Sequence, residues 1–168
     1  MNHTRTFYLL IFLICAALLG YGYYLQFAQG LEPCPLCIFQ RLAFIVTALF
    51  ALIGLIHGPG IRWSRFYNTL ITLSAITGAS IAGRQVWLQH LPPDQVPACG
   101  PGLDYMLDVF PLSETVKMVF TGSGECAEVS WTFLTLSIAE WSLICFTLLA
   151  AASLIHAFRG YLISPKSI

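Results

Sequence analysis

Four long runs of apolar residues, separated by short polar segments, dominate the pattern along the chain. The runs cover residues 7–27, 38–56, 67–88 and 141–158. A helix needs about 20 mostly apolar residues to cross the hydrocarbon core of a bilayer. The pattern therefore predicts an all-α membrane protein, a bundle of four transmembrane helices that forms a single membrane domain over residues 1–168.

The first apolar run is long and uncharged, whereas the last apolar region contains a charge. The first run carries no charge, is too long for the core of a signal peptide and precedes no small-residue cleavage pattern, so we expect an uncleaved anchor. The last apolar region, Trp131–Phe158, is too long for one perpendicular helix and is interrupted by Glu140. We therefore predict that the fourth helix begins near Trp141, with Trp131–Ala139 in the membrane interface.

Composition supports a membrane location, and charge predicts the orientation. The chain is 57% hydrophobic and 10% charged, whereas soluble domains are about 45–50% apolar. Cytoplasmic segments are enriched in basic residues, and those before the first run, between the second and third, and after the fourth are His3, Arg5, Arg62, Arg65, Arg159 and Lys166. Both termini are therefore predicted to be cytoplasmic. The short loop at about 28–37 and the long loop at about 89–140 then face the other side, and their mostly acidic composition offers no basic face for nucleic acid.

Four of the six cysteines fall in or beside these two outer loops, on the side where disulfides persist. They are Cys34, Cys37, Cys99 and Cys126, while Cys15 and Cys145 lie inside apolar runs, where we expect them only to pack. A zinc site is a poor match to the spacing, and we expect no metal. Two structural disulfides remain an alternative. A disulfide within a CxxC motif closes a very small loop that stabilises little, so the motif favours thiol exchange.

The segment LEPCPLCIFQRLAF places the CxxC at the beginning of the second helix. Pro35 suits a first helical position, so both sulfurs are predicted at a helix N-terminus, where the dipole favours a thiolate. Arg41 follows Cys37 by four residues and therefore lies on the same face, one turn deeper. The alternative for Arg41 is an interfacial arginine that extends toward the membrane surface.

The long loop has a composition suited to exchange. Its segment PLSETVKMVF predicts a short amphipathic helix capped by Ser113, and Cys126 follows a pair of glycines. Such a loop could carry a disulfide between an aqueous partner and the membrane surface. The alternative, that Cys99 and Cys126 only pin the loop, remains open on these grounds.

Three segments resemble the bacterial disulfide bond formation protein B family: PCPLCIFQR, PACGPGLDYML and GSGECAEVSWTFL. The similarity covers nearly the whole chain, in order, with all four loop cysteines in place. The resemblance implies an inner-membrane thiol oxidase that reoxidises a periplasmic thioredoxin-fold oxidase of the DsbA type and passes the electrons to a membrane quinone, either ubiquinone or menaquinone. The implied catalytic residues are Cys34, Cys37, Cys99 and Cys126, with Arg41 beside the quinone.

The sequence offers further candidate residues and leaves two other protein classes open. His90 and Arg84, near the outer end of the third run, are further candidates for quinone binding, although both could simply lie at the interface. Gln40 stands where some family members carry an acidic residue. The alternatives are a quinone reductase similar to vitamin K epoxide reductase, whose CxxC enters a later helix, and a tetraspanin-like protein with structural disulfides, whose Cys-Cys-Gly is absent from this sequence.

Overall fold

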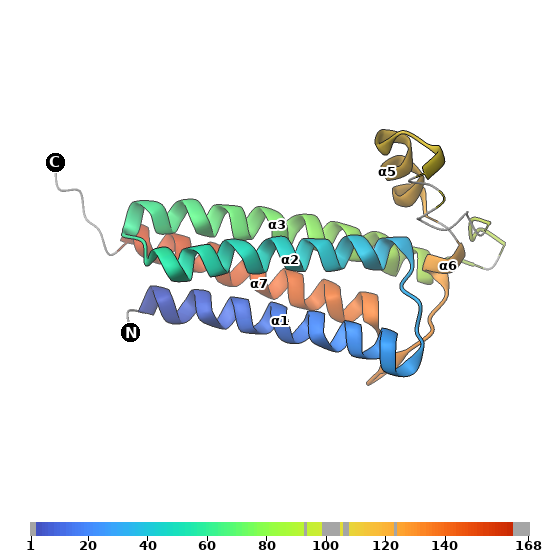
Figure 1. Ribbon diagram of the computed structural model, residues 1–168, viewed down its shortest axis with the longest axis horizontal. Coiled ribbons are helices and arrows are strands. Elements are labelled where there is room, and N and C mark those ends of the chain that lie inside the picture. Colours follow the sequence, from blue (N-terminus) through green and yellow to red (C-terminus); the bar gives the residue numbers. More distant parts are fainter. Residues whose placement is uncertain (1–2, 93, 99–104, 106–107, 123, 163–168) are drawn as a thin grey trace.

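The computed structural model describes residues 3–92, 94–98, 105, 108–122 and 124–162. Cys99 and Lys166, on which some of the sequence predictions fall, lie outside them. Four long helices run side by side (Figure 1), and they are α1 (His3–Gln29), α2 (Pro35–His57), α3 (Ile61–Gln89) and α7 (Ile138–Leu162). Helix α3 packs against both α2 and α7, and α1 packs against α2. The chain is therefore mostly helical, as the apolar pattern predicts.

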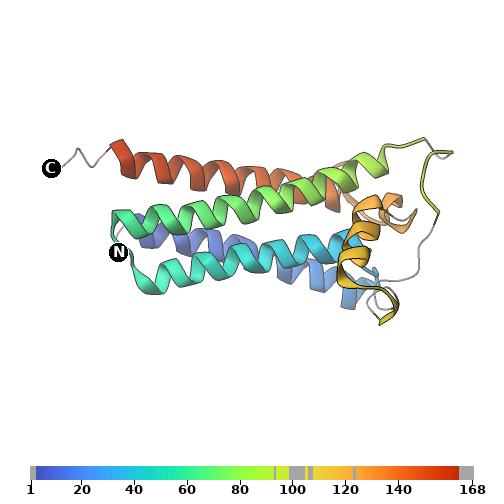
Figure 2. The same cartoon turned by 90° about the horizontal axis from the view of Figure 1, so that it is seen from above.

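The remaining elements gather at one end of the bundle. They are α5 (Leu112–Thr121), α6 (Gly124–Ala127) and a hairpin of β1 (Thr132–Phe133) and β2 (Leu136–Ser137). Figures 1 and 2 show them at the end opposite to the start of α1 and the last turns of α7. The two described ends of the chain therefore lie together, away from these elements.

Helix α2 begins and ends where its sequence favours it. Cys34 is the N-cap and Pro35 is the first helical residue, which confirms the predicted start. Gly58 closes the helix in the left-handed region, with φ +57°, and its N–H donates to the Gly54 carbonyl. This cap leads into the short turn before α3.

The predicted start of the last helix is wrong by one turn. Helix α7 begins at Ile138 and not near Trp141. The Ser137 Oγ accepts from the Glu140 N–H at 3.2 Å, and a Glu140 carboxylate oxygen accepts from the Ser137 N–H at 2.7 Å. This reciprocal pair is a capping box, which satisfies two backbone donors. Glu140 therefore starts the helix and does not interrupt it.

The predicted cap of the amphipathic helix is also wrong. Helix α5 starts at Leu112 with Pro111 as its N-cap, and no side chain caps it. Ser113 therefore lies within the first turn. The proline explains the difference, because its fixed φ suits the beginning of a helix and its C=O accepts from the N–H groups of Glu114 and Thr115.

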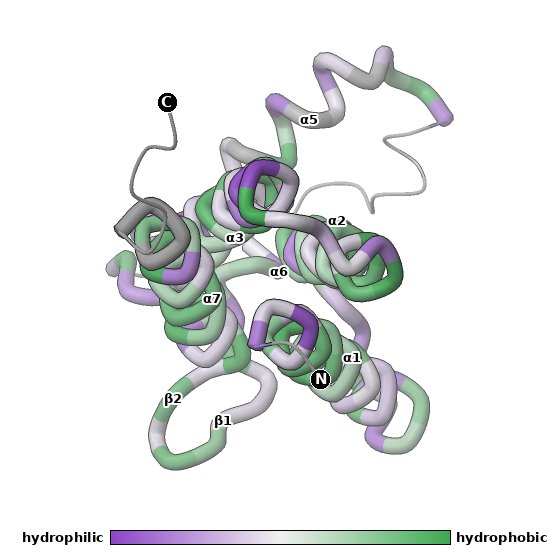
Figure 3. Tube along the Cα trace, turned by 90° about the vertical axis from the view of Figure 1, so that its left-hand side faces the viewer, coloured by the Kyte–Doolittle hydropathy of each residue, from purple (hydrophilic) through white to green (hydrophobic). Residues whose placement is uncertain are grey.

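Apolar side chains both fill the bundle and cover its outside. Among the described residues, three segments are long and apolar enough to cross a membrane: α1, α2 and Ile138–Phe158 of α7. Many of their large apolar side chains face outward, among them Leu10, Leu49 and Leu148. Figure 3, a view along the bundle, shows mainly apolar residues on these helices. A membrane protein accounts for this surface, since soluble proteins expose few such patches.

Helix α3 differs from the other three because it turns several polar side chains into the bundle. Its buried residues include Ser64, Asn68, Thr72 and Gln85. The Tyr8 hydroxyl lies 3.1 Å from the Ser64 Oγ, and the Asn68 Nδ2 lies 3.0 Å from a ring nitrogen of His156. These polar residues contribute to the lower hydropathy of α3.

Candidate functional site

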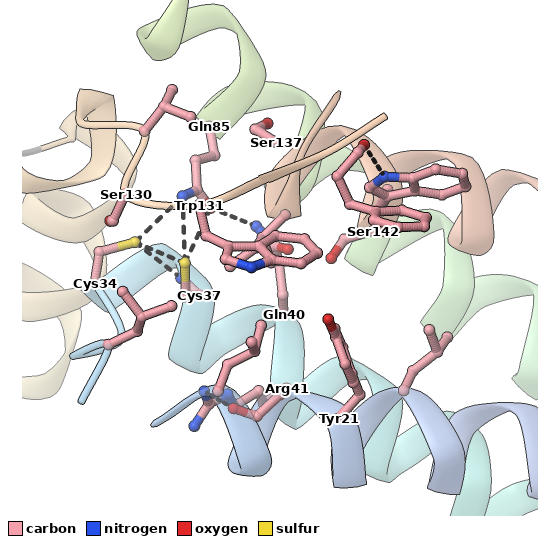
Figure 4. Close-up of a pocket in the computed structure, with 18 of the residues that line it drawn as sticks. Tyr21, Cys34, Cys37, Gln40, Arg41, Gln85, Ser130, Trp131, Ser137 and Ser142 are labelled. Atoms are coloured by element: carbon pink, nitrogen blue, oxygen red, sulfur yellow. Dashed lines mark hydrogen bonds between the residues drawn. The ribbon is translucent and has the colours of Figure 1, made fainter. Parts of the chain in front are cut away.

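A cavity of about 500 Å³ opens at the loop end of the bundle (Figure 4). It lies between the four long helices, and the segment that joins α6 to α7 forms one side. Its volume is within the range of small-molecule sites, about 300–1,000 Å³. Most of its wall is apolar or aromatic, including Leu18, Leu19, Leu25, Phe44, Trp131, Phe133 and Trp141. The cavity is therefore suited to an apolar ligand.

The cysteine pair of the CxxC motif lies in the wall of this cavity. Cys34, the N-cap of α2, and Cys37, in the first turn, are both thiols with their sulfurs 2.9 Å apart. The Cys37 N–H donates to the Cys34 Sγ at 3.4 Å, so the sulfur replaces an oxygen as the cap. The predicted position of both sulfurs at a helix N-terminus is confirmed. The two sulfurs are already close enough for a disulfide to form with little movement.

Cys126 approaches this pair from the loop side. It is buried on α6, only 1% exposed, in an apolar cluster with Leu36 and Leu88. Its side chain hydrogen-bonds with Cys34, which raises the pKa of the Cys34 thiol; the contact with Cys37 and burial act in the same direction. Three of the four outer-loop cysteines therefore meet, whereas Cys99 lies outside the described residues.

Arg41 lies in the same cavity wall, about one turn deeper than Cys37. Its Nη2 donates to the Gly22 carbonyl at 3.1 Å, and its Nη1 donates to the Gln26 side chain. The guanidinium carbon is 4.9 Å from the centre of the Tyr23 ring. All three contacts come from α1. The positive charge is thus fixed between two helices at the cavity.

Two buried amides lie in the cavity wall, and only one of them, Gln40, was singled out from the sequence. Gln40 and Gln85 are each 3% exposed, and both line the cavity. Gln85 contacts both sulfurs of the cysteine pair. The sequence did contain a signal for Gln85, a polar residue near the end of an apolar run. Polar groups inside membrane helices usually face the protein interior, so a buried position could have been expected.

The structure places the other two candidates apart from the cavity. Arg84 donates from Nη2 to the Thr121 carbonyl at 2.8 Å, which links α3 to α5. His90 caps the end of α3, with Nδ1 2.9 Å from the Val86 carbonyl and Nε2 3.9 Å from a Glu140 carboxylate oxygen. Neither belongs to the described residues that line the cavity.

The two cysteines inside the apolar runs occupy different places. Cys15 is fully buried in the main core, whereas Cys145 is half-buried and contributes to the cavity wall. Within the described part of the chain, no three His, Cys, Asp or Glu side chains gather in a way that could hold a metal ion.

Comparisons with known proteins give consistent results. The family model for "Disulfide bond formation protein DsbB" matches residues 4–156. Disulfide bond formation protein B from Methylococcus capsulatus is 55% identical over 152 residues, 90% of this chain and 93% of the relative. The Aromatoleum aromaticum protein of the same name is 51% identical over 156 residues, 93% of each chain. Disulfide bond formation protein B 1 from Pseudomonas aeruginosa is 48% identical over 155 residues, 92% of this chain and 95% of the relative.

Proposed function

Because the chain belongs to the disulfide bond formation protein B family, a family of oxidoreductases, we propose that it reoxidises a periplasmic thiol oxidase of the DsbA type and passes the electrons to a membrane quinone. This activity would support disulfide formation in secreted proteins. The observation that carries the proposal is the position of Cys34 and Cys37. On one side they contact Cys126, and on the other they open into an apolar cavity beside Arg41.

The relay begins with a disulfide between Cys99 and Cys126. A thiolate of the reduced partner attacks Cys99, so that the Cys99–Cys126 bond breaks, a mixed disulfide forms and Cys126 leaves as a thiolate. The second partner thiolate then attacks the mixed disulfide and releases Cys99. The partner has lost two electrons and gained a disulfide, and the loop pair is reduced.

The loop pair next reduces a disulfide between Cys34 and Cys37. Cys126 attacks Cys34, which it already contacts, and Cys37 leaves as a thiolate near Arg41. Attack by Cys99 on Cys126 restores the loop disulfide and releases Cys34. When Cys34 and Cys37 form their disulfide again, two electrons and two protons leave the pair.

A quinone, when bound, would accept those two electrons and two protons. The residues present fit an isoprenoid quinone, either ubiquinone or menaquinone. Phe44, Trp131 and Trp141 offer flat apolar surfaces, and Arg41 offers a fixed positive charge and N–H donors where negative charge would develop. The apolar wall also excludes water, which strengthens these polar interactions.

The proposed location is the bacterial inner membrane, with α3 as a fourth spanning helix. An even number of spans agrees with the described ends of the chain lying together at one end of the bundle. The basic residues Arg5, Arg62 and Arg65 belong to that end, which we assign to the cytoplasm. The cysteine pair, α5 and α6 then face the periplasm, where disulfides persist.

The proposal is tested with the purified protein in detergent, a reduced DsbA-type oxidase and a short-chain quinone. We expect one quinone to be consumed for every two thiols that the partner loses. Cys34→Ala and Cys37→Ala should abolish both changes. Cys15→Ala is the matched control, because Cys15 is buried in the core and is not among the residues that line the cavity, and it should keep the activity.

Variants of the loop pair separate a relay from a structural disulfide. Cys99→Ala and Cys126→Ala should stop oxidation of the partner. After chemical reduction, however, Cys34 and Cys37 should still reduce the quinone in both variants. Equal loss of folding and of quinone reactivity would instead indicate that Cys99 and Cys126 only pin the loop.

A further inference from the structure

The side-chain amide of Gln85 bridges the two sulfurs of the CxxC motif from a neighbouring helix. Its Nε2 lies 3.3 Å from the Cys34 Sγ and 3.3 Å from the Cys37 Sγ. Its Oε1 lies 3.5 Å from the Cys37 Sγ. In Figure 4, Gln85 extends from α3 toward both sulfur atoms. One buried amide of α3 is thus in contact with the reactive pair of α2.

A second amide fixes the direction of the first. The Gln40 Nε2 donates to the Gln85 Oε1 at 2.6 Å, and both side chains are 3% exposed. The Gln40 amide nitrogen can only donate. The oxygen of Gln85 is therefore engaged by Gln40, which leaves the N–H groups of Gln85 directed at the sulfurs. Burial strengthens these contacts because water does not compete for them.

We propose that Gln85 is a positioning residue that stabilises the reduced Cys34–Cys37 pair and so raises its redox potential, with Gln40 orienting the Gln85 amide. The inference deepens the proposed function and rests on it. An amide N–H donates more strongly to a thiolate than to the neutral sulfur of a disulfide, because hydrogen bonds to ionised acceptors are the stronger ones. The reduced form therefore gains more from Gln85 than the oxidised form does.

Oxidation of the Cys34–Cys37 pair changes the sulfur atoms that Gln85 contacts. On oxidation Cys37 first loses its proton to give the thiolate that Gln85 stabilises; the S–S bond then forms as the remaining S–H bond of Cys34 breaks, so that two electrons and two protons leave in all. Gln85 is unchanged in this step and loses its best acceptor. A stabilised reduced form makes the pair a stronger oxidant toward the loop cysteines, which favours electron flow from Cys126 to Cys34.

The test is the redox potential of the pair in the full-length chain. Cys99 and Cys126 are both replaced by Ala, so that the outer loops contribute only the Cys34–Cys37 pair. The protein is equilibrated with mixtures of reduced and oxidised dithiothreitol. Alkylation and mass spectrometry of the peptide containing both cysteines then give the oxidised fraction. No quinone and no partner protein are needed.

Gln85→Leu keeps most of the volume and removes the donors. We expect the equilibrium to shift about tenfold toward the disulfide, which is a fall of about 30 mV for a two-electron couple. Gln85→Glu keeps the shape but places carboxylate oxygens at the sulfurs, so it should lower the potential further. Gln40→Leu should act in the same direction by less, because the Gln85 donors remain but lose their fixed direction.

Asn68→Leu is the matched control for loss of a buried amide on the same helix. Asn68 is 1% exposed and hydrogen-bonds Ser64 and His156 at the other end of α3. It should leave the potential unchanged. Helical content by circular dichroism confirms that each variant is folded.

Two outcomes would overturn the inference, and they are distinguishable. If the unmodified pair titrates reversibly but Gln85→Leu and Gln85→Glu share its potential, Gln85 only fills space, and the proposed function is unaffected. If Cys34 and Cys37 form no reversible disulfide in the parent protein, both the inference and the proposed function fail.

Discussion

Arg41 shows how one side chain can be fixed by its neighbours before any ligand is present. Its two hydrogen bonds to α1 and its contact with Tyr23 hold the guanidinium plane at the cavity wall. The planar guanidinium, held in this way, points its N–H donors in fixed directions. A lysine keeps the positive charge but cannot reproduce this geometry. Geometry and charge should therefore contribute separately to quinone use.

We expect Arg41→Lys to raise the KM for a short-chain quinone moderately. Arg41→Gln should weaken quinone use by a factor on the order of 10²–10³, the range for loss of one donor at a developing negative charge. Gln26→Leu, which removes one anchor of the guanidinium, should have a smaller effect in the same direction. Steady-state kinetics with a saturating reduced partner measures all three.

Arg84 and His90 provide the comparison within the same assay. The sequence suggests both as quinone contacts, but the proposed quinone site uses neither, because neither belongs to the described residues that line the cavity. Arg84→Gln and His90→Gln should therefore change the KM less than twofold. If Arg41→Gln left KM and kcat unchanged while Arg84→Gln raised KM, the quinone would bind elsewhere.

At the level of single residues, the sequence predicts what depends on local spacing. Pro35 at the first helical position, the sulfurs at the helix start and Arg41 one turn deeper all follow from positions along one helix. The contact of Gln85 with the sulfurs depends on how α3 is rotated and shifted against α2. No short pattern in the sequence specifies how two helices are rotated and shifted against each other. The contact between Gln85 and the sulfurs could therefore not be predicted from the sequence.

At the element scale, the packing of α3 against α7 depends on Gly78. A Cβ at Gly78 of α3 would overlap the ring of Phe146 on α7. Phe146 is fully buried and stacks on Phe44, with ring centres 3.8 Å apart, so its ring has little room to move. The small residue lets two helices approach closely, as is common in membranes.

Gly78→Ala should therefore lower the free energy of unfolding by about 1–3 kcal/mol, the usual cost of overpacking a core. Because Phe44 also lines the cavity, the KM for quinone should rise as well. Gly83→Ala on the same helix is the control, since its nearest neighbour would be Leu143 at an ordinary 3.9 Å. Denaturation in mixed detergent micelles compares the two variants; equal stability would contradict the packing argument.

The start of α7 shows where the sequence held a signal that the prediction missed. Ser137 and Glu140 have the spacing of a capping box, which begins a helix. The prediction gave more weight to the charge of Glu140 inside an apolar region. The short hairpin before it could not be predicted in the same way, because Leu134 and Thr135 adopt positive φ values of 51° and 70° that their residue types disfavour.

Ser137→Ala should lower the free energy of unfolding by about 1 kcal/mol, the typical cost of losing an N-cap. The hydroxyl also donates to Gln89 of α3 at 2.8 Å, so the start of α7 loses a second contact. Thr147→Ala serves as the control, because Thr147 is exposed and bonds only within its own helix in the described structure. Thermal unfolding followed by circular dichroism would show a lower midpoint for Ser137→Ala than for Thr147→Ala. Equal midpoints for the two variants would contradict a stabilising role of the cap.

At the scale of the whole molecule, the four apolar runs predict the number of long helices, but the structure extends each of them. Helices α2 and α7 begin before their apolar runs because their caps, Cys34 and the Ser137–Glu140 pair, and not hydropathy, mark where they start. The position of the cavity was not predictable, since its wall is formed jointly by α1, α2, α3, α7 and the segment between α6 and α7. The runs alone do not specify that arrangement.

The last prediction concerns the orientation of the molecule in the membrane. The turn at Gly60 and both described ends of the chain lie at one end of the bundle, with Arg5, Arg62 and Arg65 in the adjoining first turns. Fusions of green fluorescent protein after Gly60 and at the C-terminus should fluoresce, because this reporter folds in the cytoplasm. Alkaline phosphatase fused at Pro101 in the long loop should be active, because its disulfides form in the periplasm. If the Pro101 fusion were inactive while its fluorescent counterpart were bright, Cys34, Cys37 and Cys126 would face a reducing compartment, and the proposed relay could not operate.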